Sequence, residues 1–337
     1  MGKIMRNDVK EKCDLFISNG REMKNAFKWD SGLINIAAST ALTSADKKVD
    51  VERLKECKDI IKKYAGVFSG FRSMAEPVVL CKMSLEDDPE KYISELKSVY
   101  DKISKTAFSD SGYMVQAAIS VCDAKKAGEK DEIADKLKQL YKKMSKKHPI
   151  LTSSEDIVFA TLLAMTDKSV DTIIEEMEQC YTYLKDDVKL RVGANEIQGL
   201  SEVLALTDGD MKTKCDKVVK LYNTFKEHKV RYGTEYNEFA SLGTLIDIEE
   251  NPDVLVSEII ETEAYIKSHK GFGDWTMNKK QRLLFAAMIV GEVYGGENSV
   301  SLNSAIRSSV SAVIAAEVAM IICISASTTL AATTSAN

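Results

Sequence analysis

The chain has 337 residues, of which 45% are hydrophobic and 29% are charged, and its formal net charge at pH 7 is −5. This balance is typical of a folded globular protein, and the acidic net charge argues against a nucleic-acid-binding protein, which normally carries a basic surface. Only four prolines are present, so helices are rarely interrupted and the predicted fold class is all-α.

The N-terminus and the cysteines indicate the compartment. Met1 to Arg6 contain no apolar stretch of the kind that directs secretion. The seven cysteines are scattered and form no C-x-x-C pair, so they predict small buried side chains in a reducing environment rather than a zinc site. We therefore expect a cytoplasmic protein with no metal and no cofactor.

Two hairpins of helices are predicted before any regular repeat begins. The first runs from about Val9 to Ala45. The second pairs a helix that contains Cys57 and Tyr64 with a helix over Val78 to Leu85.

From Leu96 onward the chain repeats a pattern of about forty residues. Apolar anchor residues recur at steps of 41, 40, 41 and 41 residues, namely Ile103, Met144, Leu184, Phe225 and Ile266. An apolar residue also stands seven positions before each anchor, which places the pair on one face of a helix. A second apolar segment that ends in an acid follows the first four anchors, at Asp123, Asp167, Asp208 and Asp247. Each repeat is therefore predicted to be an αα-hairpin, and residues 1–296 an αα-hairpin repeat solenoid of about seven hairpins.

Residues 297–337 form an apolar tail rich in Ala and Ser. Between Ser308 and Ala332 the only charged residue is Glu317, and a carboxylate at the centre of a bilayer costs roughly 2.5–3.5 kcal/mol. Small residues at four-residue steps permit close helix packing; in the tail they include Ser311, Ala315, Ala319 and Cys323. We expect a partly helical tail that packs against the array or against a second copy of the chain. Membrane insertion and disorder are the alternatives.

Four runs of residues carry a resemblance to a known family. They are Leu42-Thr43-Ser44, Leu54-Lys55-Glu56-Cys57-Lys58, His148-Pro149-Ile150-Leu151-Thr152-Ser153-Ser154-Glu155-Asp156, and Lys270-Gly271-Phe272-Gly273 followed by Lys279-Lys280-Gln281-Arg282. In these runs the chain resembles the bacterial family catalogued as domain of unknown function four thousand and three. The likeness covers nearly the whole chain. It implies a bacterial, cytosolic, helical protein, and it implies no activity.

The loops from the first to the second helix of each hairpin, which we call the A-to-B edge, place large apolar residues beside glycines. Glycine there can simply end a helix while its neighbour packs on the core. Aromatic residues also anchor interfaces, however. We predict a partner-binding edge that consists of Trp29, Phe71, Tyr113, His148, Tyr232, Phe272 and Trp275.

The sequence contains no Walker loop, nucleophile elbow or H-E-x-x-H motif, and no catalytic residue is predicted. The predicted function is a non-enzymatic helical-repeat scaffold that binds a protein or peptide partner, since such arrays usually bind. One alternative is an enzyme of the α/α-toroid type, in which the hairpins close into a ring around an acidic pocket. A second is a tail-anchored adaptor at the membrane surface. A closed ring with paired acids that face a central cavity favours the enzyme, and an open superhelix favours the scaffold.

Overall fold

The computed structural model describes residues 5–27, 32–64, 75–105 and 112–298, together with Val310 and Ile314. These residues form fourteen α-helices and no β-strand, which confirms the predicted all-α fold. Some of the predicted site residues lie outside the described residues, namely Trp29, Phe71, Ser311, Ala315, Ala319 and Cys323.

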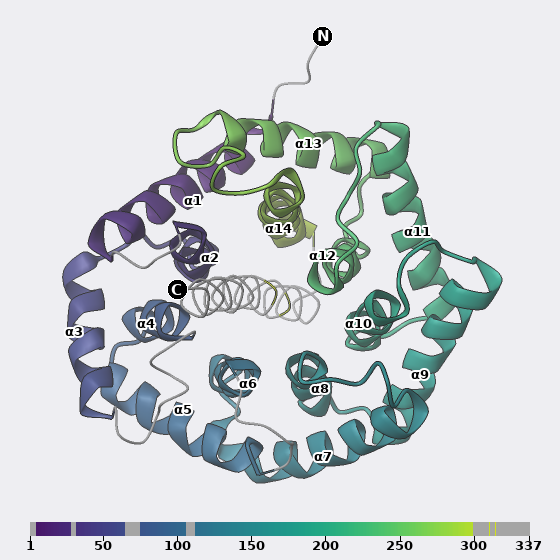
Figure 1. Ribbon diagram of the computed structural model, residues 1–337, viewed down its shortest axis with the longest axis horizontal. Helices are drawn as coiled ribbons and strands as arrows, with labels where there is room; N and C mark the ends of the chain where they lie inside the picture. Colours follow the sequence, from purple (N-terminus) through teal and green to yellow (C-terminus); the bar gives the residue numbers. More distant parts are fainter. Residues whose placement is uncertain are drawn as a thin grey trace, which may run out of the picture.

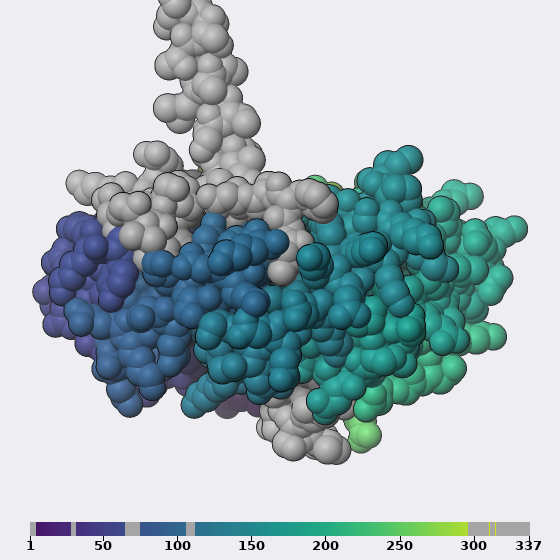
Figure 2. All heavy atoms as spheres, turned by 90° about the horizontal axis from the view of Figure 1, so that it is seen from below, coloured from purple at the N-terminus to yellow at the C-terminus, as the bar shows by residue number. Residues whose placement is uncertain are grey.

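The helices alternate between an outer and an inner layer around a ring (Figure 1). The outer helices are α1 (Asn7–Ala26), α3 (Val51–Lys63), α5 (Pro89–Ile103), α7 (Lys130–Lys147), α9 (Val170–Thr182), α11 (Met211–Glu227) and α13 (Pro252–Ser268). The inner helices are α2 (Gly32–Ser44), α4 (Glu76–Leu85), α6 (Gly112–Asp123), α8 (Asp156–Ala164), α10 (Ala194–Ala205), α12 (Tyr236–Ser241) and α14 (Lys279–Asn298). Three short helical turns complete the set: η2 (Ala127–Glu129), η3 (Tyr183–Asp187) and η4 (Leu242–Leu245). Seen from the side, the ring is a thick disc (Figure 2).

The outer helices are amphipathic, as their sequence spacing predicts. In α7 the buried residues include Ile133, Leu137, Leu140 and Met144, at steps of three or four. Most outer helices also begin at a side chain that accepts a hydrogen bond from a backbone N–H of the first turn, which typically stabilises a helix by about 1 kcal/mol. These caps are Asp50, Asp88, Ser169, Asp210 and Asn251. The five repeat anchors are all buried, from 0% to 2% exposed.

The inner helices are buried on every side. All nine residues of α8 are buried, and nine residues make about 2.5 turns, so no face of this helix meets solvent. In α6 the buried run covers Gly112–Cys122, and in α10 it covers Ile197–Ala205. A helix that is apolar all round belongs inside a protein rather than at its surface. The side of the inner helices that faces the ring centre is therefore as dry as the side that faces the outer helices.

The array closes on itself, because α13 and α14 both contact α1. The backbone N–H of Arg6 donates to Glu258 Oε1 at 2.8 Å, and the hydroxyl of Tyr265 donates to Asp14 Oδ1 at 2.7 Å. The ends of an open superhelix would lie apart, whereas here the first and last hairpins are neighbours. The described helices thus close into a ring (Figure 1).

Aromatic packing reinforces this closure. The ring of Phe16, on α1, has its centroid 5.8 Å from that of Phe272 and 5.4 Å from that of Phe285, and all three side chains are at most 1% exposed. Phe272 lies in the loop before α14 and Phe285 lies on α14. One side chain at the start of the chain is therefore packed between two from its last hairpin.

Two residues of the predicted tail are also in the core. Val310 is 1% exposed and Ile314 is 0% exposed, and both belong to the same hydrophobic cluster as the inner helices. They stand four positions apart, which is one turn of a helix. The tail therefore contributes at least these two apolar side chains to the interior.

Replacing Phe16 tests the closure. We expect Phe16→Ala to lower the free energy of unfolding by roughly 3–5 kcal/mol, because it leaves a cavity between the two ends of the array. Urea unfolding followed by circular dichroism measures this loss. Ile150→Ala, at a side chain that is 93% exposed, is the control and should change stability by less than about 0.5 kcal/mol. Equal effects of the two substitutions would show that the closure contributes little.

Candidate functional site

Four polar side chains from three consecutive inner helices meet inside the ring. Asp156 is the first residue of α8, Gln198 and Glu202 lie on α10, and Tyr236 is the first residue of α12. All four are buried, and both Asp156 and Glu202 are 0% exposed. We call this group the acid–tyrosine cluster.

Asp156 holds the centre of the cluster. Its Oδ1 accepts a hydrogen bond from Gln198 Nε2 at 2.9 Å and lies 3.2 Å from the Tyr236 hydroxyl. Its Oδ2 accepts from the backbone N–H of Ser153 at 2.6 Å. The Tyr236 hydroxyl also lies 3.1 Å from Glu202 Oε2. The tyrosine thus bridges the two carboxyl groups.

The number of protons in the cluster follows from these contacts. A tyrosine hydroxyl carries one proton and can donate one hydrogen bond, yet it lies within bonding distance of two carboxyl oxygens. Both contacts are hydrogen bonds only if one carboxyl group is protonated. Burial, and then the neighbouring Asp156 charge, raise the pKa of Glu202 well above its ordinary value. The raised pKa of Glu202 favours its protonated form, and a protonated Glu202 allows both contacts of the Tyr236 hydroxyl to be hydrogen bonds.

Two acceptor oxygens of the cluster have no hydrogen-bond partner. They are Gln198 Oε1 and Glu202 Oε1, and both are buried. A buried acceptor that lacks a donor destabilises a fold by about 1–3 kcal/mol. The cluster therefore combines two buried carboxyl groups, of which Glu202 has a raised pKa, with two acceptors that lack a donor. Groups of this kind are found at proton-transfer and ligand-binding sites.

Three of the predicted partner-binding residues are buried, and their partner-binding role stays a prediction. Tyr113 is 7% exposed, and Tyr232 and Phe272 are 1% exposed. The Tyr232 ring packs 4.7 Å from that of Phe225, and its hydroxyl lies 2.7 Å from Ser241 Oγ. These rings fold back onto the hairpins, where burying an aromatic side chain yields more stabilisation than exposing it.

The other two described residues of the predicted edge are closer to solvent. His148 Nε2 lies 2.8 Å from Glu178 Oε1, and the His148 ring packs 4.5 Å from that of Tyr181. Trp275 is fully exposed, and so nearly is Ile150 at 93%. The α7–α8 and α13–α14 loops that carry these residues lie on opposite sides of the ring (Figure 1). The structure therefore does not gather the predicted residues into one patch.

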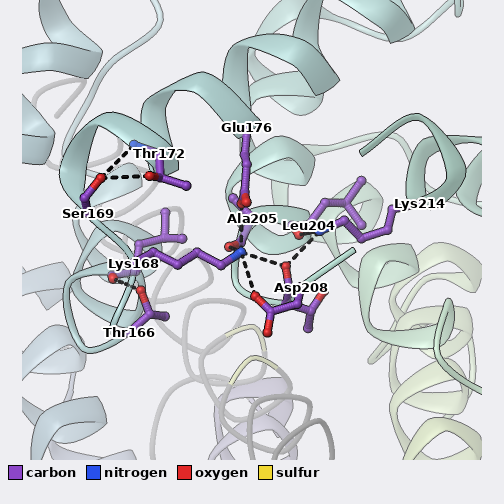
Figure 3. A network of polar contacts seen from close by, with 11 residues as sticks. Thr166, Lys168, Ser169, Thr172, Glu176, Leu204, Ala205, Asp208 and Lys214 are labelled. Carbon is purple, nitrogen blue, oxygen red and sulfur yellow. Dashed lines mark hydrogen bonds and ion pairs between the residues drawn. The ribbon is translucent and has the colours of Figure 1, made fainter. Parts of the chain in front are cut away.

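At the opposite end of α10, two lysines bind main-chain carbonyl groups (Figure 3). Lys214 is 4% exposed, and its Nζ donates to Leu204 O at 2.7 Å and to Thr207 O at 2.8 Å. Lys168 Nζ donates to Ala205 O at 3.0 Å and to Thr207 O at 2.8 Å. Cations in this position satisfy the free carbonyls of a helix C-terminus and complement its dipole. We interpret this network as structural.

A cavity of about 400 Å³ lies where the ring closes, between α1 and α14. Its walls are Asp8, Glu11, Lys12, Leu15, Asp46, Glu292 and Val293. Lys12 Nζ lies 2.8 Å from Asp46 Oδ1 and 3.5 Å from Glu292 Oε2. The ammonium group of Lys12 therefore already forms ion pairs with two of the acids that line the cavity.

Sequence reasoning missed the acid–tyrosine cluster. It assigned one buried face to the second helix of each hairpin, and on that assumption Glu202 lies on the solvent side. The available signal was an acid inside the apolar run from Leu200 to Leu206. Glu202 is an interior residue because α10 is buried on all sides from Ile197 to Ala205.

The described residues offer neither a metal site nor a membrane span. In that part of the chain, no group of three or more His, Cys, Asp or Glu side chains is placed to hold a metal ion. None of the described helices is both long and apolar enough to cross a lipid bilayer.

Comparison with known proteins gives a family and one distant relative. Residues 19–319 match the family described as Protein of unknown function (DUF4003). The chain is 22% identical over 258 residues to Uncharacterized protein YeaA from Bacillus subtilis (strain 168), an alignment that covers 74% of this chain and 76% of the relative. No solved structure matches the chain significantly.

The protonation of Glu202 can be tested by pH. The folded state holds this proton more tightly than the unfolded chain, where glutamate has a pKa near 4.5. The stability that Glu202 contributes is therefore complete below that pH and is lost as pH rises through the raised folded pKa. The glutamine of Glu202→Gln is neutral at every pH. The free energy of unfolding of this variant, minus that of the wild type, should therefore increase by about 1.4 kcal/mol per pH unit within this window.

Urea unfolding of both proteins at several values between about pH 5 and pH 8 measures this difference. The exposed Glu22 provides the control, since Glu22→Gln should stay within about 0.5 kcal/mol of the wild type. If the difference in free energy of unfolding between Glu202→Gln and the wild type does not change with pH, then Glu202 is not protonated in the folded state.

Proposed function

The chain belongs to the DUF4003 family, whose description assigns no activity, and from this premise we propose that it is a non-enzymatic helical-repeat ring that holds an apolar polypeptide segment at its centre. The observation that carries the proposal is the burial of Val310 and Ile314. These two side chains follow the last hairpin in sequence and pack in the core of the ring.

The inner helices supply the matching surface. Most of their residues are buried and apolar, as in α8, where all nine residues are buried and only Asp156 and Thr161 are polar. A mostly apolar surface favours an apolar polypeptide segment over a charged one. In this chain the matching segment is the one that contains Val310 and Ile314.

The proposed partner is therefore a protein segment of the same chemistry. An intramolecular segment competes with any external one at an effective concentration in the millimolar range. A partner must either displace it or bind it once it is released. The predicted contacts of the tail with a second copy or with a membrane are possible fates of a released segment, and the predicted cytoplasmic location stays a prediction.

A specific observation favours a second candidate, an enzyme of the α/α-toroid type. Asp156 and Glu202 form a buried pair of carboxyl groups that Tyr236 bridges, and burial raises the pKa of Glu202. Pairs of carboxyl groups supply the base and the acid of many reactions. A thermal-shift screen of small esters, amides and glycosides tests this candidate. A compound that stabilises the wild type and fails to stabilise Asp156→Asn supports it. The absence of any such compound favours the ring that only binds.

The central segment is tested first by stability. Ile314→Asp places a carboxylate at a side chain that is 0% exposed, so we expect a clear fall in the midpoint of thermal unfolding because a buried charge has no partner there. Ile150→Asp makes the same chemical change at an exposed position and should leave the midpoint nearly unchanged. Equal midpoints for the two variants would show that Ile314 does not pack in the core.

A binding experiment tests the partner directly. A fluorescent peptide that spans residues 305–320 is titrated into the wild type and into the Val310→Asp, Ile314→Asp double variant. We expect the double variant to bind it by fluorescence anisotropy, and the wild type to bind it at least about 100-fold more weakly, because its own segment competes. A folded double variant that binds no peptide would contradict the proposal.

A further inference from the structure

Two cysteines of neighbouring outer helices are in direct contact. Cys180 lies on α9 and Cys215 on α11. The Cys215 thiol donates to Cys180 Sγ across an Sγ–Sγ distance of 3.1 Å. A disulfide bond is about 2.05 Å long, so the two sulfur atoms need to approach by only about 1 Å to form one. Both are free thiols and 0% exposed.

The surrounding contacts keep the two sulfur atoms together. Lys214, the residue before Cys215, anchors α11 to the carbonyl groups at the end of α10. Lys168, just before α9, binds the same end of α10 (Figure 3). Both helices are thus fixed to one common point, Thr207 O. The sulfur contact is a consequence of this anchoring and not of a flexible loop.

We propose that Cys180 and Cys215 are a disulfide site, at which a small disulfide such as oxidised glutathione joins α9 to α11. The Cys180 or Cys215 thiolate attacks the small disulfide, forms a mixed disulfide and releases one glutathione thiolate. The second cysteine then attacks the mixed disulfide and releases the second glutathione. Two protein thiols are oxidised, one glutathione disulfide is reduced to two thiols, and no other reagent is needed.

Burial sets the rate of this reaction. The hydrogen bond from Cys215, together with burial, raises the pKa of the Cys180 thiol well above its ordinary value. The thiolate is the attacking species, and neither sulfur is exposed to an oxidant in the closed ring. Formation is therefore slow in the native state and accelerates when α9 and α11 separate, and the bond once formed is equally protected from reductants.

The product should be more stable than the reduced chain. A disulfide that closes a long loop restricts the unfolded ensemble, and the two cysteines are separated by 35 positions. We expect the midpoint of thermal unfolding to rise on oxidation.

The experiment uses the full chain. It is incubated with oxidised glutathione, with and without urea below the unfolding midpoint. The intact mass is measured first, and the sample is then alkylated and its peptides are mapped by mass spectrometry. We expect an intact mass about 2 Da lower, from the loss of two hydrogen atoms, and a linked peptide pair that contains Cys180 and Cys215. Urea should accelerate its formation several-fold.

Other cysteines and one variant serve as controls. Cys57 and Cys81, also buried on neighbouring helices, should remain alkylated as thiols. Cys180→Ser should abolish both the mass loss and the rise in melting midpoint. The wild-type peptide map needs no variant, so it decides the question even if Cys180→Ser folds poorly. Absence of the linked pair after long incubation in urea and return to buffer, or formation of the bond with a lower melting midpoint, would overturn the proposal.

Discussion

The structure depends on the contact that closes the ring, in which Phe16 packs between Phe272 and Phe285. An open array of the same hairpins would leave the inner helices with one face in water, although most of the buried side chains on these helices are apolar. Closure removes that face from solvent. Its entropic cost grows only slowly with the number of residues between the ends, so joining residues some 250 positions apart costs little more than a shorter loop. The apolar area buried along the inner layer then outweighs this cost.

A dry centre determines how the few polar groups inside it are arranged. Arg282, which is 0% exposed, is neutralised by Glu263 Oε1 at 2.7 Å and by Asp274 Oδ1 at 2.7 Å. Asp156 and Glu202 have no such cation, and two adjacent carboxylates in a medium of low polarity would repel strongly. Keeping a proton on Glu202 leaves a single charge, which the donors around Asp156 stabilise. Buried charge is thus neutralised by an ion pair at Arg282, and the repulsion between Asp156 and Glu202 is relieved by a proton.

The sequence was sufficient for the elements and insufficient for their closure. The helices, the buried anchors such as Met144 and the acids that begin the outer helices follow from local spacing and helix electrostatics. Ring closure does not, because a hairpin has the same apolar pattern whether the array curves openly or meets its own start. Phe272 illustrates this gap, because its ring is buried against Phe16 of the first hairpin. Glu202 is interior for another reason, since Asp156 and Tyr236 of the neighbouring inner helices enclose it.

The closure also differs from every other junction in the ring in its covalent connectivity. Consecutive hairpins are joined by the chain, whereas α1 meets α13 and α14 only through side chains and hydrogen bonds such as Tyr265 to Asp14. If the ring opens to exchange a central segment, this is the junction that separates with the least constraint. The Cys180–Cys215 contact lies on the connected side, between α9 and α11. A covalent bond there would stabilise the wall of the ring without blocking its entrance, so oxidation and segment exchange are independent properties of the fold.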